Sequence, residues 1–283
     1  MKFCVLRSGS SGNCTYIEHR DTRVILDAGG MSKIGLERLF DEIGVNALLL
    51  NGVLISHLHT DHINKSTFNF CRSNNIALFI HEENRAGLES MFDEKCRREV
   101  EIKFFRSEKS FSIGEVRFTP FELSHDANGV TNGFVFQCAL DENAPTTGYA
   151  TDLGHVPPDV IEAVTGCSTL IIEANHDTSL LWDNPGRPYA HKARVGGKKG
   201  HLSNEQAAQA IGELLNDPDS PLRTVTLCHL SKDHNSPELA LEQVKNILGD
   251  KGEKISFAVA RRDRRTDFFT MEEIAYRQRG KEA

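Results

Sequence analysis

One dense run of metal-ligand side chains, residues 56–62, constrains the fold of this chain more than any other feature. It reads Ser-His-Leu-His-Thr-Asp-His and directly follows a short apolar, strand-like segment. Side chains two residues apart on an extended segment point to the same side, so His57, His59 and Asp61 can face one cavity. A turn after the run lets His62 join them. Imidazole nitrogens with one carboxylate suit zinc, so the run predicts a metal site, the alternative being a polar loop rich in histidine.

The run resembles the signature of the metallo-β-lactamase superfamily. That family has an α/β fold, a four-layer αββα sandwich of two mixed sheets flanked by helices, with metals at the strand ends. Such a fold needs further ligands, each just after an apolar strand. His125, Asp152 and His229 occupy such positions and match, in order, the family's third, fourth and fifth motifs. Taken alone, each of them is as readily explained as an ordinary loop residue.

Carried over to this chain, the family pattern implies seven ligands for two divalent metal ions. One ion would be held by three histidines, His57, His59 and His125. The other would be held by Asp61, His62 and His229, with Asp152 bridging the two ions. Seven ligands exceed what a structural zinc needs and leave room for a shared hydroxide, as in a hydrolytic site. Asp61 is predicted to be a catalytic residue as well as a metal ligand. Zinc is the favoured metal, with manganese and iron as alternatives.

Length and composition predict one globular domain. The chain has 283 residues, and no low-complexity linker or fixed-period repeat divides it, so residues 1–283 are interpreted as a single metallo-β-lactamase-fold domain. Hydrophobic residues make up 39% and charged residues 26%, which is typical of soluble globular proteins. A net charge of −7 gives no global basic footprint for nucleic acid, so any such affinity must be local.

The seven cysteines are scattered, odd in number and without a C-x-x-C pair, which indicates reduced thiols and a cytoplasmic location. The first residues are interpreted as a strand and not as a signal peptide. No apolar run approaches the length of a membrane span, so no membrane partner is expected. The oligomeric state is left open.

Residues 8–13 form a turn rich in serine and glycine between two strand-like segments, and a tight hairpin accounts for it fully. A near-identical turn marks the YycJ (WalJ)-like branch of the superfamily, where it lies near the metals. This resemblance implies that Ser10, Ser11 or Asn13 hydrogen-bonds substrate. The superfamily also has a buried Asp at the end of a following strand, which implies that Asp27 orients a ligand histidine.

A Glu at a strand end and a His before a helix form a second candidate group. Glu173 ends a buried strand, and His201 precedes a helix predicted to begin with Ser203 as N-cap and Gln206 completing a capping box. The two resemble the Glu/His pair of phosphodiesterase branches, in which the carboxylate orients the imidazole and the imidazole protonates the leaving oxygen. The alternative is a structural hydrogen-bonded pair. His176 is a weaker candidate for contact with substrate.

Residues 187–199 contain five Lys or Arg and no acid in a chain of negative net charge. Such a run is usually a solvated loop. This one lies between the two candidate catalytic residues, so Arg194, Lys198 and Lys199 are candidates to bind phosphates without base specificity. A second basic cluster, residues 261–265, has acidic neighbours and is the weaker candidate. Apolar spacing further predicts helices at 35–45 and 237–248 and a last strand at 255–259.

The resemblance as a whole implies a metal-dependent phosphodiesterase or nuclease, specifically a DNA exonuclease involved in DNA repair that uses a hydroxide held by two metals. DNA is favoured over RNA as substrate, although the chain is too short to hold the large inserted domain of the β-CASP nucleases. The alternative enzyme is a thioester or lactone hydrolase of the same fold, which gives the basic run and the Glu/His pair no task. A scaffold or nucleic-acid-binding protein without catalysis is a third hypothesis, which the intact ligand set disfavours.

Overall fold

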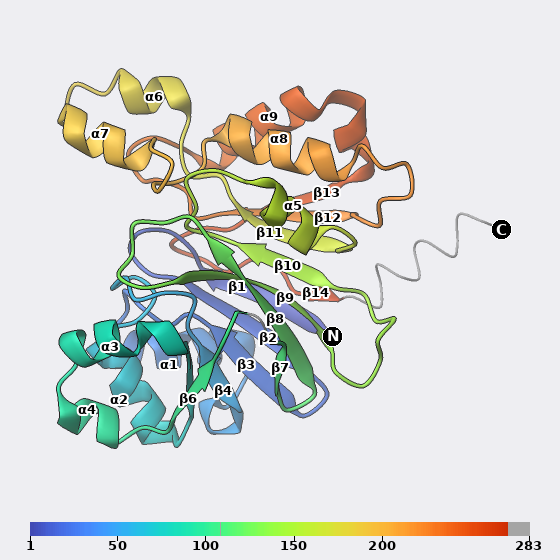
Figure 1. Cartoon of the computed structure of the whole chain (residues 1–283). Helices are drawn as coiled ribbons and strands as arrows, with labels where there is room; N and C mark the ends of the chain where they lie inside the picture. The colour runs from blue at the N-terminus through green and yellow to red at the C-terminus, as the bar shows by residue number, and fades with distance from the viewer. Residues whose placement is uncertain (108, 271–283) are drawn as a thin grey trace.

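The structure is a computed structural model that describes residues 1–107 and 109–270. Within these residues the strands form two mixed, seven-stranded sheets that lie face to face (Figure 1). The first sheet has the order β14 (Phe269–Thr270), β1 (Lys2–Arg7), β2 (Cys14–His19), β3 (Thr22–Leu26), β4 (Gly52–Leu54), β5 (Leu78–His81), β6 (Ile102–Phe105). The second has the order β13 (Ser256–Val259), β12 (Thr224–Cys228), β11 (Thr169–Glu173), β10 (Thr147–Ala150), β9 (Thr131–Cys138), β8 (Val116–Leu123), β7 (Phe111–Ile113).

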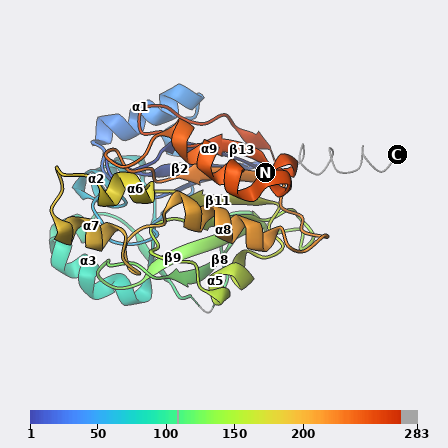
Figure 2. The same ribbon diagram turned by 90° about the horizontal axis from the view of Figure 1, so that it is seen from above.

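Helices cover the outer face of each sheet (Figures 1 and 2). The first sheet is covered by α1 (Lys33–Ile43), α2 (Lys65–Asn74), α3 (Arg85–Met91) and α4 (Glu94–Arg98). The second is covered by α5 (Pro158–Val164), α8 (Asn204–Leu214) and α9 (Pro237–Leu248), while α6 (Thr178–Trp182) and α7 (Tyr189–Val195) stand at one end of the molecule. Short 3₁₀ helices lie at Ala47–Leu49, Glu82–Asn84 and Gly249–Lys254.

Three apolar clusters separate these layers. Phe3 and Leu26 of the first sheet meet Phe118 and Phe136 of the second in a cluster between the sheets. Two further clusters fill the space between each sheet and its helices. Burial of apolar surface on both faces of each sheet requires this layering. The predicted four-layer αββα sandwich is therefore confirmed.

Neighbouring parallel strands bring the functional loops to one edge of the molecule. β3 to β6 are parallel in the first sheet, and β10 to β13 are parallel in the second. Strands β4, β11 and β12 are buried along their whole length, as expected for parallel strands covered on both faces. The loops that leave the carboxyl ends of these strands can therefore converge, which is where ligands bind in α/β folds.

The predicted helix starts are confirmed at α8 and α9. The Ser203 hydroxyl accepts a hydrogen bond from Gln206 N at 3.2 Å, and Ser203 N donates to Gln206 Oε1 at 2.8 Å. These two bonds form the predicted capping box. In α9 the Ser236 side chain accepts from Leu239 N, with Pro237 in the first helical turn.

Two predictions about elements are wrong. Ser256–Val259 does form the predicted strand, β13, but it is not the last, because Phe269–Thr270 pairs with β1. Two residues carry no hydrophobic period, so this strand leaves no signal in the sequence. Residues 187–199 were expected to be a loop, whereas Tyr189–Val195 is helical: Pro188 occupies the N-cap, and alanine, lysine and arginine favour the helix.

The described part of the chain bears on two expectations, the lack of a membrane-spanning segment and the reduced state of the cysteines. No helix in it is long and apolar enough to cross a membrane. The seven cysteines are all free, and all but Cys96 are buried.

Candidate metal centre

The predicted ligands lie together at the carboxyl ends of the parallel strands. Residues 56–62 follow β4, and the other ligands follow strands of the second sheet. Three residues at these strand ends, Asp27, Asp152 and His229, have positive φ angles of 62°, 64° and 55°. Left-handed backbone is uncommon outside glycine and clusters at functional sites, where surrounding contacts hold it. The chain therefore turns sharply at these three strand ends.

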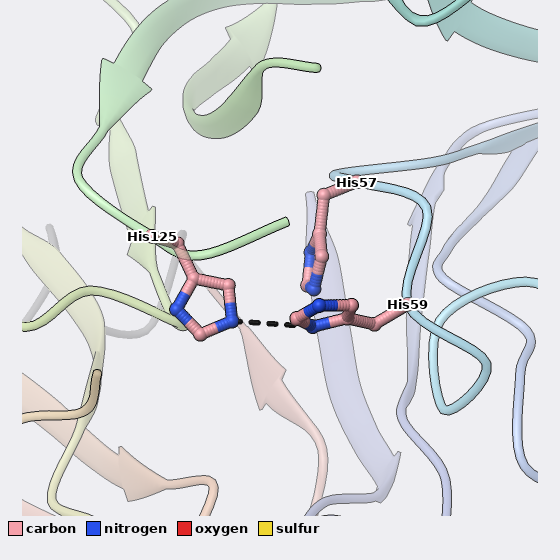
Figure 3. Close-up of side chains that lie close together, drawn as sticks. All are labelled: His57, His59 and His125. Atoms are coloured by element: carbon pink, nitrogen blue, oxygen red, sulfur yellow. Dashed lines mark hydrogen bonds between the residues drawn. The ribbon is translucent and has the colours of Figure 1, made fainter. Parts of the chain in front are cut away.

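Four overlapping groups of side chains have ligand atoms within 4.8 Å of one another. They are His57, His59 and His125; Asp61, His62 and His229; His57, His62 and Asp152; and Asp152, Glu173, His201 and His229. Figure 3 shows the rings of His57 and His59, from the loop after β4, turned toward the ring of His125, from the loop after β8. The His125 Nε2 and His59 Nδ1 atoms lie 3.2 Å apart. Every residue predicted to bind metal thus belongs to one of these groups.

Asp152 lies between the two predicted ligand sets. Its carboxylate oxygens are 3.2 Å from His62 Nε2, 3.5 Å from His229 Nε2 and 3.7 Å from His125 Nε2. Oδ2 of Asp152, Nε2 of His57 and Nε2 of His229 are buried without a hydrogen-bond partner. Buried polar atoms normally have one, and nitrogen and carboxylate ligands of this kind suit zinc and related ions. These residues therefore fit divalent metal; the number of ions and their division among the ligands stay predictions.

A buried carboxylate braces the ligand loop. Asp27 Oδ2 lies 2.8 Å from His62 Nδ1, and the carboxylate also accepts hydrogen bonds from Ser56 N at 2.9 Å and from the Ser56 hydroxyl. The Tyr149 hydroxyl donates to the same oxygen at 3.3 Å. Asp27 thus contacts a predicted ligand as the resemblance implied. Ser56 and Tyr149 were missed, since the partners lie up to 122 residues apart in the chain.

Burial and charge divide the histidines into two kinds. Burial lowers the pKa of His57, His59 and His125, so these rings are neutral and keep a lone pair for metal. Burial also opposes charge on His62 and His229, but carboxylates outweigh it, chiefly Asp27 for the first and Asp152 for the second, and raise the pKa of both rings. Without metal, these two histidines therefore carry protons at neutral pH.

Loading the metal-free protein with zinc is expected to release protons at pH 7. The ordinary histidine pKa is 6.5, and the pKa values of His62 and His229 lie well above it, so metal must displace their protons. Metal affinity should fall as the pH is lowered through these raised pKa values. Isothermal titration calorimetry in two buffers of different ionisation enthalpy measures the release. An equal heat in both buffers would show that no proton leaves and contradict the protonated state.

Glu173 is shared between two histidines. Its Oε1 lies 2.8 Å from His201 Nδ1 and 2.7 Å from His229 Nδ1, while its Oε2 accepts hydrogen bonds from the backbone of Leu153 and Leu202. Burial acts to raise the pKa of Glu173, but the two histidines outweigh it and lower the pKa to about 2. The carboxylate is therefore ionised and holds both rings by Nδ1. The predicted contact with His201 is present, and the contact with His229 was not foreseen.

The candidate substrate residues lie in different environments. Ser10 and Ser11 are exposed, whereas Asn13 is buried with its side-chain amide 3.0 Å from His62 Nε2 and its Oδ1 accepting from Gly9 N. His176 is also buried, and burial lowers its pKa to about 4. Asn13 and His176 therefore offer substrate less surface than the sequence suggested.

One of the three basic candidate residues, Arg194, borders a cavity beside the centre. A cavity of about 470 Å³ has His59 and Asp61 in its wall, together with Asp126 and Arg194. Arg194 donates to both oxygens of Asp126, at 2.5 and 3.2 Å. The Lys198 and Lys199 side chains are exposed, and the Lys198 carbonyl accepts from the Ser124 hydroxyl. The cavity is therefore a route by which an anion could reach the metal ligands.

Replacing Gly29 by alanine is expected to displace the ligand loop. A Cβ on Gly29 would lie 2.2 Å from His62 N and 2.4 Å from Asp61 C, so backbone would have to move. We expect a loss of about 1–3 kcal/mol in the free energy of unfolding together with weaker metal binding. The control is Gly212→Ala in α8, where the nearest atom is 3.5 Å away. Urea denaturation and a metal titration measure both effects, and a Gly29→Ala protein as stable as the Gly212→Ala protein would contradict this account.

Comparison with known proteins gives matches over most of the chain. The family model described as "Beta-lactamase superfamily domain" matches residues 22–239. The chain is 30% identical over 253 residues to the Exodeoxyribonuclease YycJ of Bacillus anthracis, covering 89% of this chain and 90% of the relative. It is 30% identical over 263 residues to the Exodeoxyribonuclease WalJ of Streptococcus pneumoniae serotype 2, covering 91% and 93%. The metallo-beta-lactamase fold protein YhfI from Bacillus subtilis is similar in structure, with a TM-score of 0.68 and 15% identity over 94% of this chain and 99% of that chain.

Proposed function

Because this chain belongs to the metallo-β-lactamase superfamily, as a member of its YycJ-like branch, we propose that it is a metal-dependent exodeoxyribonuclease that acts in DNA repair. The fold and the ligand cluster are those of a hydrolase. The two sequence relatives named above as exodeoxyribonucleases support the choice of DNA, since each is matched over about nine-tenths of its length.

The proposed centre has two ions and seven ligands. His57, His59 and His125 would hold one ion, and Asp61, His62 and His229 the other, with Asp152 between them. When bound, two divalent ions supply Lewis-acid charge that activates water and neutralises charge developing on a phosphate. Zinc is the proposed metal, with manganese and iron as the alternatives to be tested. Asn13, Asp27 and Glu173 hold the ligand side chains in place.

The contact between Glu173 and His201 is the observation that carries the proposal. Cleavage of a phosphodiester expels an alkoxide, a poor leaving group that needs a proton. Since Glu173 occupies Nδ1 of His201 at 2.8 Å, Nε2 is the atom left to exchange a proton with substrate. His201 also lies at the metal ligands, with Nδ1 3.7 Å from Asp152 Oδ1, and its side chain keeps 16% exposure. A thioester, whose thiolate leaves readily, gives this pair no task.

The surroundings of the centre agree with an anionic polymer as substrate. Arg194 faces the cavity that contains His59 and Asp61, and Lys198 and Lys199 extend the same segment. Such contacts fix a phosphate backbone without reading bases, which is what an exonuclease requires. We further propose that residues 1–283 form one domain, of which residue 108 and residues 271–283 lie outside the described part. We also propose that the protein works in the reducing cytoplasm, where its cysteines stay free.

Two small substrates separate this function from the thioester or lactone alternative. The metal-loaded protein is expected to hydrolyse bis(p-nitrophenyl) phosphate and to leave a glutathione thioester intact, because the site is built around a phosphodiester's needs. Loss of the phosphodiesterase activity after chelation, and its return with zinc or manganese, would show that hydrolysis depends on the metal centre. Hydrolysis of the thioester alone would replace the nuclease proposal by the thioesterase one.

A further inference from the structure

Two aromatic side chains stand exposed on the pair of short helices α6 and α7. Trp182 ends α6 and is 38% exposed, and Tyr189 begins α7 and is 75% exposed. Their ring centroids lie 5.9 Å apart at an angle of 44°. Only Leu181 of α6 and Val195 of α7 are buried, so the hairpin keeps its aromatic rings out of the core. In Figures 1 and 2 the two helices stand at one end of the molecule, beyond α8.

The segment that carries these rings is rich in cations. Residues 178–200 contain five Lys or Arg against one acid, Asp183, in a chain whose net charge is −7. The Lys192 ammonium donates to the backbone carbonyl of Trp182 at 2.6 Å, which holds a positive charge at the end of α6. Lys198 and Lys199 are exposed on the segment that leaves α7. Arg187 and Arg194 are paired with Asp233 and Asp126, which leaves Lys192, Lys198 and Lys199 as the cations available to an anionic chain that carries flat bases.

The hairpin is linked to the metal centre through the segment that follows α7. The indole of Trp182 lies against Gly196, because a Cβ added there would meet the ring at 3.3 Å. Four residues further on, the carbonyl of Gly200 accepts a hydrogen bond from the ligand His125 at 2.9 Å. Arg194 of α7 lines the cavity that contains His59 and Asp61. Helix α7 and the segment after it therefore border both the aromatic pair and the cavity beside the ligands.

We propose, resting on the nuclease function proposed above, that the α6–α7 hairpin is a stacking platform for the unpaired bases of single-stranded DNA. Tyr189 and Trp182 each offer a ring face to a base, and the neighbouring lysines contact the phosphates between bases. Stacking on an aromatic face tolerates every base, as a sequence-independent exonuclease needs. Bases inside a duplex are already stacked, so the platform favours a frayed or single-stranded end.

A docked protein fits this surface less well than DNA. Within the described hairpin the exposed large apolar side chains are Leu180, Trp182 and Tyr189, too few to form the core of a stable protein interface. The positive charges of Lys192, Lys198 and Lys199 would also lack partners on an ordinary protein surface.

The intrinsic fluorescence of the protein can be used to follow binding at this site, because Trp182 is its single tryptophan. Metal-loaded full-length protein is titrated with a short phosphorothioate oligothymidine, which resists cleavage, while the intrinsic tryptophan fluorescence is followed. A phosphorothioate oligomer of abasic residues, of equal length and charge, is the comparison ligand. We expect the oligothymidine to quench the fluorescence through stacking, and the abasic oligomer to bind without quenching.

Removing the second ring tests the platform independently of tryptophan. Tyr189→Ala is expected to weaken binding of the oligothymidine on the order of tenfold, while affinity for the abasic oligomer is kept. The matched control is Leu140→Ala, another exposed apolar side chain, 64% exposed in the loop between β9 and β10, which should change neither affinity. Circular dichroism and metal content show whether each variant folds as the parent does.

The outcomes separate this inference from the proposed function. Quenching by oligothymidine in a protein that cleaves no DNA would support the stacking platform and contradict the nuclease function. Cleavage of DNA without quenching, or with Tyr189→Ala binding as tightly as the parent, would overturn the platform and leave the nuclease standing. Equal quenching by blunt duplex and single strand, or a fluorescence change that depends on protein concentration alone, would also contradict it, the latter indicating a second copy on this surface.

Discussion

Replacing His201 by alanine is expected to slow DNA cleavage by about 100- to 10,000-fold while metal binding is retained. His201 lies 2.8 Å from Glu173 and close enough to Asp152 and His229 to share a metal with them, but it is not one of the seven proposed ligands. Its loss should therefore remove a proton donor and leave the proposed ligand set complete. Single-turnover cleavage of labelled DNA measures the rate, and elemental analysis by mass spectrometry measures the metal. The matched control is His155→Ala, a nearby histidine that hydrogen-bonds the carbonyl of Lys198 and should change the rate far less.

The leaving group separates a proton donor from a merely structural histidine. Nitrophenolate leaves without protonation, so the His201→Ala protein should lose much less activity on bis(p-nitrophenyl) phosphate than on DNA. Equal losses on both substrates would mean that His201 supports the site in another way. Full activity on DNA with both metals in place would refute the general-acid assignment outright.

Replacing Asp27 by alanine is expected to lower the free energy of unfolding by about 3–5 kcal/mol, because it leaves charged and polar partners unpaired in the core. The Asp27 side chain is fully buried and accepts from Ser56 and Tyr149 as well as facing His62. Loss of this support should also weaken metal binding by about 10- to 100-fold.

An exposed aspartate provides the comparison for that variant. Asp21 lies in the turn between β2 and β3, and Asp21→Ala should change stability by no more than about 0.5 kcal/mol. Chemical denaturation of the metal-free proteins isolates the structural effect, and competition with a chelator gives the metal affinity. An Asp27→Ala protein that unfolds at the same denaturant concentration as the Asp21→Ala protein would show that the buried carboxylate does not brace the loop.

The metal cluster could be predicted because its ligands have a local signature. Residues 56–62 place four ligand-type side chains after one strand, and His125, Asp152 and His229 each follow another. Strand ends are visible in the sequence through apolar runs, and the fold brings such ends together. The capping box of Ser203 and Gln206 was equally visible, since a cap is a property of four consecutive residues.

Contacts between distant residues could not be predicted in the same way. The hydroxyls of Ser56 and Tyr149 meet on Asp27, and Glu173 binds His229 as well as His201, yet no spacing in the chain records these meetings. They depend on how the two sheets pack, which the hydrophobic pattern fixes only coarsely. Helix α7 was missed for another reason: its charge suggested a solvated loop, although its residues favour a helix.

The central claim is tested most directly by incubating end-labelled single- and double-stranded DNA with metal-reconstituted protein and with the metal-free form. The account predicts stepwise shortening from an end by the metal-loaded protein, faster on the single strand, and no shortening by the metal-free form. If neither DNA nor RNA is cleaved with zinc, manganese or iron bound, the chain is not a nuclease.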